Sequence, residues 1–147
     1  MATKQQILDD FITAFKAKDE VKKRTLAFVK SEILVFEKSG SDKKVDDDKL
    51  MEILKSMAKK RKESIAAYEA GNRDDLAKIE QEELAVIEAY LPEQMSEGQV
   101  RETIEKIVAD NGFVAKDFGQ AMGKVMSELR GKVDGGLAGK ILKEILT

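Results

Sequence analysis

The chain of 147 residues contains no cysteine and no histidine. Without cysteine it can form neither a disulfide nor a thiolate metal site, which fits a reducing compartment. Without histidine it lacks the commonest general base near neutral pH and the commonest protein ligand of metal ions. Only carboxylate or lysine chemistry remains for catalysis, so we expect no catalytic residue, no cofactor and no metal site.

Proline and aromatic residues are scarce. The chain has one proline and 5% aromatic residues, whereas 42% of its residues are hydrophobic and 37% are charged. This composition predicts an all-α protein with an apolar core and a charged surface. No segment approaches the roughly 18 consecutive apolar residues of a membrane helix, and the N-terminus has no apolar signal core. We therefore expect a soluble, cytoplasmic protein with no membrane partner.

The charges are unevenly distributed, although the net charge is only −2. Residues 72–110 contain 4 basic and 11 acidic side chains, a difference of −7, whereas residues 111–147 contain 6 and 4, a difference of +2. The net charge disfavours unspecific binding to nucleic acid, but basic faces can persist outside the acidic segment.

Apolar residues recur at three- and four-residue intervals in seven segments, each of which predicts an amphipathic helix. Thr3, Asp19, Asp46, Asn72, Ser96 and Asp134 stand where N-caps are expected, and Ser96 with Gln99 forms a capping box. Four predicted helices precede Pro92 and three follow it. We expect two helical subdomains, residues 1–92 and residues 93–147. The predicted helices lie close to residues 3–17, 19–40, 47–70, 72–92, 96–112, 116–130 and 134–147.

The apolar stripes also predict which side chains face inward. Ile12 and Phe15 in the first helix, Phe28 in the second, Ile79 in the fourth and Phe118 in the sixth belong to these stripes. All five are expected in the core.

Gly119 and Gly123 lie one turn apart in the sixth predicted helix, where each costs about 1 kcal/mol relative to alanine. Two such glycines on one face indicate that something approaches the backbone closely. It is either a neighbouring helix of the same protein or the backbone of a partner such as RNA. Gly131 extends this set into the following turn. Gly135-Gly136 would leave amides open to an anion, unless Asp134 caps them.

The acidic residues Glu80, Glu82, Glu83 and Glu88 cluster in the fourth predicted helix. Such a cluster could hold a metal ion or supply acid–base chemistry. Because the chain has no histidine and lysines are available on neighbouring helices, ion pairing is the favoured interpretation.

Several stretches resemble the YqeY-like (GatB/YqeY) family. They are Tyr90-Leu91-Pro92-Glu93-Gln94-Met95-Ser96, Met122-Gly123-Lys124-Val125-Met126 and Gly131-Lys132-Val133-Asp134-Gly135. The resemblance extends over nearly the whole chain. This family is similar to the tail domain of the B subunit of the tRNA-dependent amidotransferase, which converts glutamate or aspartate attached to tRNA into the amide.

The resemblance implies a two-part all-helical fold whose parts meet near Pro92. In the amidotransferase the tail helps to hold tRNA, while the chemistry lies elsewhere. The resemblance therefore implies an accessory protein that binds tRNA or a tRNA-handling complex and has no activity of its own. It implies RNA contacts at Lys124, Arg130, Lys132 and Lys140.

Two positions differ from the family pattern and weaken the inference of RNA contacts. Asp134-Gly135 replaces the Asn-Pro of the amidotransferase tail, and Gly139 replaces a frequent asparagine. One alternative is a module that docks on an amidotransferase or a synthetase. The other is a carbon–nitrogen ligase with glutamine as amide donor, which the absence of histidine, cysteine and a nucleotide motif disfavours.

Overall fold

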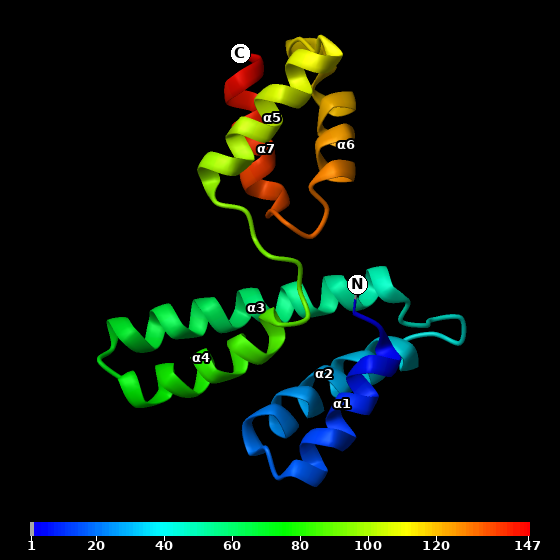
Figure 1. Cartoon of the computed structure of the whole chain (residues 1–147), viewed down its shortest axis with the longest axis vertical. Coiled ribbons are helices and arrows are strands. Elements are labelled where there is room, and N and C mark those ends of the chain that lie inside the picture. The colour runs from blue at the N-terminus through cyan, green and yellow to red at the C-terminus, as the bar shows by residue number, and fades with distance from the viewer. Residues whose placement is uncertain (1) are drawn as a thin grey trace. The chain divides into compact units, whose positions relative to one another are not determined.

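A computed structural model describes residues 2–147 and contains helices but no strand in this range (Figure 1). The all-α prediction is confirmed. The elements in chain order are α1 (Lys4–Ala17), α2 (Glu20–Lys38), α3 (Asp47–Ala70), α4 (Asp74–Glu88), α5 (Glu97–Asn111), the short 3-10 helix η1 (Ala115–Asp117), α6 (Phe118–Glu128) and α7 (Gly135–Leu146).

The helices form two compact units, the first ending at Pro92 and the second spanning Glu93–Thr147. Each unit has its own cluster of buried apolar side chains. The first cluster is built on Ile7, Leu26, Val29, Ile33, Val45, Leu50, Leu54, Met57, Ala58 and Ile87. The second is built on Val100, Ile104, Ile107, Ala121, Val125, Leu129, Val133, Ala138, Ile141 and Leu142.

The first unit consists of two helical hairpins, α1–α2 and α3–α4 (Figure 1). Helix α2 packs on both α3 and α4. Tyr90, just beyond α4, donates its hydroxyl to Asp10 of α1 at 2.6 Å. Burial of the Tyr90 side chain, together with this carboxylate, raises the pKa of the phenol above its ordinary value.

Glu83 of α4 is a buried carboxylate that connects three helices. Its Oε1 accepts a hydrogen bond from Nε of Arg24 in α2, and its Oε2 accepts one from Nε of Arg61 in α3, both at 3.1 Å. The Arg61 guanidinium also lies over the Phe28 ring, 5.5 Å from its centroid. Glu88 pairs with Lys62 at 3.9 Å. Ion pairing is thus the observed role of these two carboxylates, although Glu83 is buried and its partners are arginines.

The second unit is a bundle of α5, α6 and α7 in which α7 packs against both other helices. Helices α5 and α6 make fewer contacts with each other. Arg101 of α5 donates to Glu144 of α7 at 2.6 Å. This hydrogen bond lowers the pKa of the Glu144 carboxyl below its ordinary value.

Four of the predicted helix starts carry the expected side-chain cap. Oxygen atoms of Thr3, Asp19, Asp46 and Ser96 accept the N–H groups of Gln6, Lys22, Lys49 and Gln99, at 2.7–3.2 Å. The Gln99 side chain accepts the Ser96 N–H in return at 3.0 Å, which completes the capping box. These bonds satisfy amides that the helix itself leaves without partners.

The prediction for Asn72 is wrong. Asn72 adopts the left-handed conformation, with φ of 57°, and ends α3 instead of capping α4. The N–H of Arg73 then bonds to the carbonyl of Tyr68 at 2.8 Å, which is the pairing of a Schellman motif. Asparagine tolerates this conformation better than most residues. Helix α4 also ends earlier than predicted, at Glu88, because residues before Pro92 are disfavoured in the α region.

The predicted inward orientation is wrong for five apolar side chains. Ile12, Phe15, Phe28, Ile79 and Phe118 are exposed, with 38–61% of their surface accessible. Helix α6 begins only at Phe118, and this ring is not among the side chains that form or pack against the second core. In α1 the fully buried side chains are Ile7 and Ala14. Phe11 is partly buried and packs against this core, whereas Ile12 and Phe15 extend past it.

Candidate functional site

The turn that precedes α7 is bound to the segment that precedes α5. The side-chain amide of Gln94 donates to the carbonyl of Gly131 at 2.7 Å, and the N–H of Met95 donates to the carbonyl of Lys132 at 2.9 Å. Gly131 has φ of 80°, a conformation that favours glycine. Gly131 is buried, whereas Lys132 is exposed.

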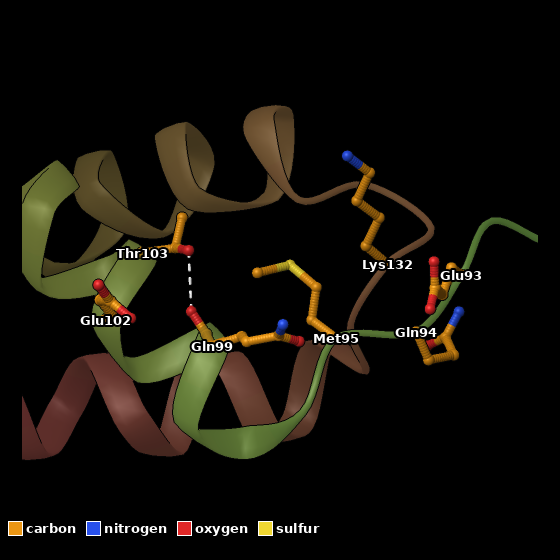
Figure 2. A pocket seen from close by; sticks show the side chains of 7 residues that line it. All are labelled: Glu93, Gln94, Met95, Gln99, Glu102, Thr103 and Lys132. Carbon is orange, nitrogen blue, oxygen red and sulfur yellow. Dashed lines mark hydrogen bonds between the residues drawn. The ribbon is translucent and has the colours of Figure 1, made fainter.

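A hollow of about 470 Å³ lies beside this junction (Figure 2). Figure 2 shows Lys132 and Glu93 toward one end, Glu102 toward the other, and Met95 and Gln99 between them. The Gln99 and Thr103 side chains are held by hydrogen bonds to the Ser96 N–H and the Gln99 carbonyl. The lining residues are Glu93, Gln94, Met95, Gln99, Glu102, Thr103 and Lys132.

A second hollow of about 560 Å³ shares Glu102 and Thr103 with the first and continues along α5 toward Asn111 and Glu128. Carboxylates outnumber ammonium groups in the combined lining, which contains Glu93, Glu102, Asp110, Glu128, Lys106 and Lys132. Carboxylates repel phosphate, so this flank of the second unit is poorly suited to nucleic acid. Its charge suits a basic partner.

The structure does not gather the four predicted RNA-binding cations on one face. Lys132 lines the acidic hollow, and Lys124 lies 3.6 Å from Glu128, which lines the second hollow. Arg130 is exposed in the turn after α6, and Lys140 is exposed on α7. Lys124 and Lys132 therefore belong to the acidic flank, whereas Lys140 lies on another helix of the bundle.

Two methionines of α6 pack over glycines of α7. A Cβ atom at Gly139 would lie 3.7 Å from the Met122 methyl group, and one at Gly135 would lie 3.8 Å from that of Met126. The two methionines therefore pack over α7 where its residues lack side chains. These contacts also define an antiparallel pair, since Met126 faces the start of α7 and Met122 its next turn.

The first interpretation of Gly119 and Gly123 is wrong. A Cβ atom added at either position would meet no atom within 4 Å in the part of the chain that the structure describes. No neighbouring helix packs there, because Met122 and Met126 make the contact with α7 instead. Gly119 lies three residues before Met122, and Gly123 lies three residues before Met126. Both glycines therefore lie on the adjoining, solvent-facing side of α6. The alternative, approach by a partner, stays a prediction.

Asp134 occupies the N-cap position of α7, but its side chain makes no capping hydrogen bond. Its carboxylate Oδ2 would lie 3.2 Å from a Cβ atom at Gly136. A negative charge beside the first turn of α7 opposes the binding of an anion there.

Of the residues that line the two hollows, only Lys132 was a candidate binding residue from the sequence. The capping box at Ser96 and Gln99 was a local signal for the start of α5. No local pattern, however, indicated that Gln94 and Met95 would bond to a turn about 37 residues away. Among residues 2–147, no group of three or more acidic side chains is placed to hold a metal ion, and no helix is long and apolar enough to cross a membrane.

A family model described as Yqey-like protein matches residues 4–146. This chain belongs to the YqeY-like family. The resemblance noted in the sequence is thereby confirmed, and it extends over both units.

Curated relatives of this YqeY-like chain include fungal proteins named "Altered inheritance of mitochondria protein 41, mitochondrial". The protein from Meyerozyma guilliermondii is 40% identical over 90 residues, which are 61% of this chain and 47% of the relative. The protein from Vanderwaltozyma polyspora is 39% identical over 82 residues, 56% of this chain and 44% of the relative. The matches thus span a little less than half of these relatives.

A third relative is the E subunit of the glutamyl-tRNA(Gln) amidotransferase of Thermococcus sibiricus. It is 40% identical over 55 residues, which are 34% of this chain but only 9% of the relative. A relation to an amidotransferase component is therefore supported by sequence. The expected cytoplasmic localisation is contradicted, because the fungal relatives are named as mitochondrial proteins.

Proposed function

We propose that this YqeY-like protein is an accessory factor that binds tRNA through the α6–α7 side of its second unit and performs no chemistry of its own. The observation that carries the proposal is the open face at Gly119 and Gly123. Alanine would stabilise a helix at both positions, so glycine there is explained by a ligand that must come close to the backbone.

Exposed cations elsewhere in the second unit support the same ligand. Lys140 and Lys143 are exposed on α7, the helix against which α6 packs, and Arg130 is exposed just beyond α6. Lysine and arginine contacts to phosphate position a protein on nucleic acid without reading its sequence. Lys124 and Lys132 lie among carboxylates, so we propose that they contribute less than Lys140. The match to a component of a glutamyl-tRNA amidotransferase supports tRNA as the nucleic acid.

A titration with fluorescently labelled tRNA at several salt concentrations tests the proposal. The logarithm of the association constant should fall linearly with the logarithm of the salt concentration. The slope reports the number of phosphates contacted. Lys140→Glu should weaken binding at every salt concentration. Lys106→Glu makes the same charge change on the acidic flank of the second unit and should have little effect. Absence of binding at low salt, or equal losses in the two variants, would contradict the proposal.

The acidic hollows favour a second candidate, a module that docks on an amidotransferase or a synthetase. A basic segment of such a partner would complement Glu93, Glu102, Asp110 and Glu128. Affinity capture of partners with and without nuclease treatment separates the two functions. Partners held through tRNA are released by nuclease, whereas a docked protein stays bound and is released by Glu102→Lys.

A further inference from the structure

The α1–α2 hairpin of the first unit exposes apolar side chains on the side away from its core. Ile12 and Phe15 of α1 and Leu34 of α2 are 51%, 61% and 51% accessible. Leu8 of α1 is half-buried beside them. We call Leu8, Ile12, Phe15 and Leu34 the outer hairpin face. Exposed apolar side chains that gather in this way mark interaction sites more often than isolated ones do.

Helical geometry places the three α1 residues on one stripe. Each residue rotates the helix by about 100°, so Leu8, Ile12 and Phe15 lie within about 80–140° of the buried Ile7. They follow one another at intervals of four and three residues, the spacing by which one helix contacts another. The stripe therefore continues the hydrophobic surface of α1 beyond the part that the core covers.

Contacts between the two helices bring Leu34 to the same side. Lys4 pairs with Glu37 at 2.9 Å, and the Lys30 ammonium lies over the Phe11 ring at 4.0 Å from its centroid. Leu34 is one turn beyond Lys30 and three residues before Glu37, so it lies beside Leu8 in this antiparallel pair. Two antiparallel helices with apolar side chains along their junction form a groove into which a third helix packs.

Ammonium groups lie within and around this face. The Lys23 ammonium is 5.2 Å from the centroid of the Phe15 ring, and Lys30 covers Phe11. Lys16 is exposed at the next turn of α1. Carboxylates nearby include Glu20, which pairs with Lys23 at 3.4 Å, Glu37, which pairs with Lys4 at 2.9 Å, and Asp9, which accepts from Gln5 at 2.9 Å. The apolar side chains are thus accompanied by lysines that point to an acidic partner.

We propose that the outer hairpin face binds an amphipathic helix of another protein, with apolar side chains at three- and four-residue spacing and carboxylates flanking them. A second copy of this chain fits poorly, because a two-fold interface would set this lysine-bearing face against an identical one. An anionic bilayer also attracts lysines beside an apolar stripe, so the vesicle measurement below separates it from a helical partner. A helix with glutamates beside its apolar stripe pairs with these lysines instead. This site lies in the first unit and does not depend on tRNA binding by the second.

The probe is a synthetic, fluorescein-labelled 18-residue peptide with leucines at helical spacing and glutamates beside them. Its matched control carries lysines in place of the glutamates. The full-length protein should bind the glutamate peptide saturably in an anisotropy titration. Ile12→Ser and Phe15→Ser should each lower the affinity by about tenfold or more, since each removes a large apolar contact. Ile79→Ser, which removes an exposed apolar side chain from α4, should change nothing.

Charge reversal completes the test. Lys23→Glu combined with Lys30→Glu should weaken binding of the glutamate peptide and strengthen binding of the lysine peptide. Because all substituted side chains are at least partly exposed, circular dichroism should show unchanged helicity. The proposal is overturned if both peptides bind equally, or if Ile12→Ser and Phe15→Ser leave binding unchanged. It is also overturned if these variants instead abolish binding to phosphatidylglycerol vesicles, or abolish a dimer seen by sedimentation.

Discussion

Glu83 shows how a single residue organises the first unit. It is 6% accessible and accepts hydrogen bonds from two arginines on different helices. Removing one member of a buried ion pair is costly, because the charges left behind lose their partner in a medium that solvates them poorly. Arg61 is the more vulnerable partner, since its side chain is 13% accessible, whereas that of Arg24 is 41% accessible.

Glu83→Ala should therefore destabilise the protein by about 3 kcal/mol, near the lower end of the range for breaking a buried pair. Urea unfolding followed by circular dichroism measures the change. Glu88→Ala, which removes the exposed partner of Lys62 in the same helix, should cost less than about 1 kcal/mol. Equal effects of the two substitutions would show that Glu83 does not hold the three helices together.

Glu37 makes stability depend on pH. Hydrogen bonds from the Lys4 ammonium and the Val45 N–H hold the pKa of its carboxyl below the ordinary value of 4.5. Such a group contributes stability above its unfolded-state pKa and loses this contribution as the pH falls through its folded-state pKa. Glu37→Gln should thus lower the urea midpoint near pH 7, and the difference from the natural protein should shrink below pH 4.5.

The matched control is Glu32→Gln, which removes an exposed carboxylate from the same helix. It removes a carboxylate of α2 but leaves the bonds of Glu37 with Lys4 and Val45 intact. A difference for Glu37→Gln that stays constant from neutral pH to about pH 3 would be inconsistent with the lowered pKa.

Among the individual helices, α6 carries two glycines at positions where alanine would stabilise the helix more. Gly119 and Gly123 adopt ordinary helical conformations, and a Cβ atom at either would meet nothing within 4 Å. Helix stability therefore gains nothing from these glycines. A face without side chains does, however, allow a partner to come close to the helix backbone.

Gly119→Ala combined with Gly123→Ala should raise the free energy of unfolding by about 1 to 2 kcal/mol, because alanine restricts the unfolded chain and favours the helix. The same variant should bind tRNA more weakly if RNA lies on this face. Stability by urea unfolding and affinity by anisotropy should thus change in opposite directions. Gain of stability with unchanged affinity would place the RNA elsewhere.

At the scale of the whole molecule, the two hydrophobic clusters share no residue among positions 2–147. One draws only on residues up to Leu91 and the other only on residues from Met95 onward. We propose that residues 1–92 and 93–147 are structural domains. The bonds from Gln94 to Gly131 and from Met95 to Lys132 support a boundary just after Pro92.

Inserting Gly-Ser-Gly-Ser between Pro92 and Glu93 should change the free energy of unfolding by less than about 1 kcal/mol, because lengthening a flexible connection costs little. The same insertion between Arg130 and Gly131 should be clearly more destabilising, since it displaces the turn that Gln94 and Met95 bind. Urea unfolding of both variants provides the comparison. Similar losses at the two positions would contradict the proposed boundary.

The all-α class and most helix boundaries could be predicted from the sequence, because capping and apolar spacing act between residues three or four apart. Thr3, Asp46 and Ser96 each bond to an amide three residues on, as their positions predicted. The family, too, could be identified from residues at fixed spacing.

Helix packing decides which apolar side chains are buried and which polar groups pair with each other. Only the tertiary structure shows this. Phe15 and Ile79 fit their helical stripes but are exposed, with 61% and 44% of their surface accessible, and Glu83 meets arginines 22 and 59 residues away. Gly119 and Gly123 appeared to accommodate a neighbouring helix until the fold placed Met122 and Met126 in that contact. Burial and ion pairing depend on elements far apart in the chain, so no local pattern specifies them.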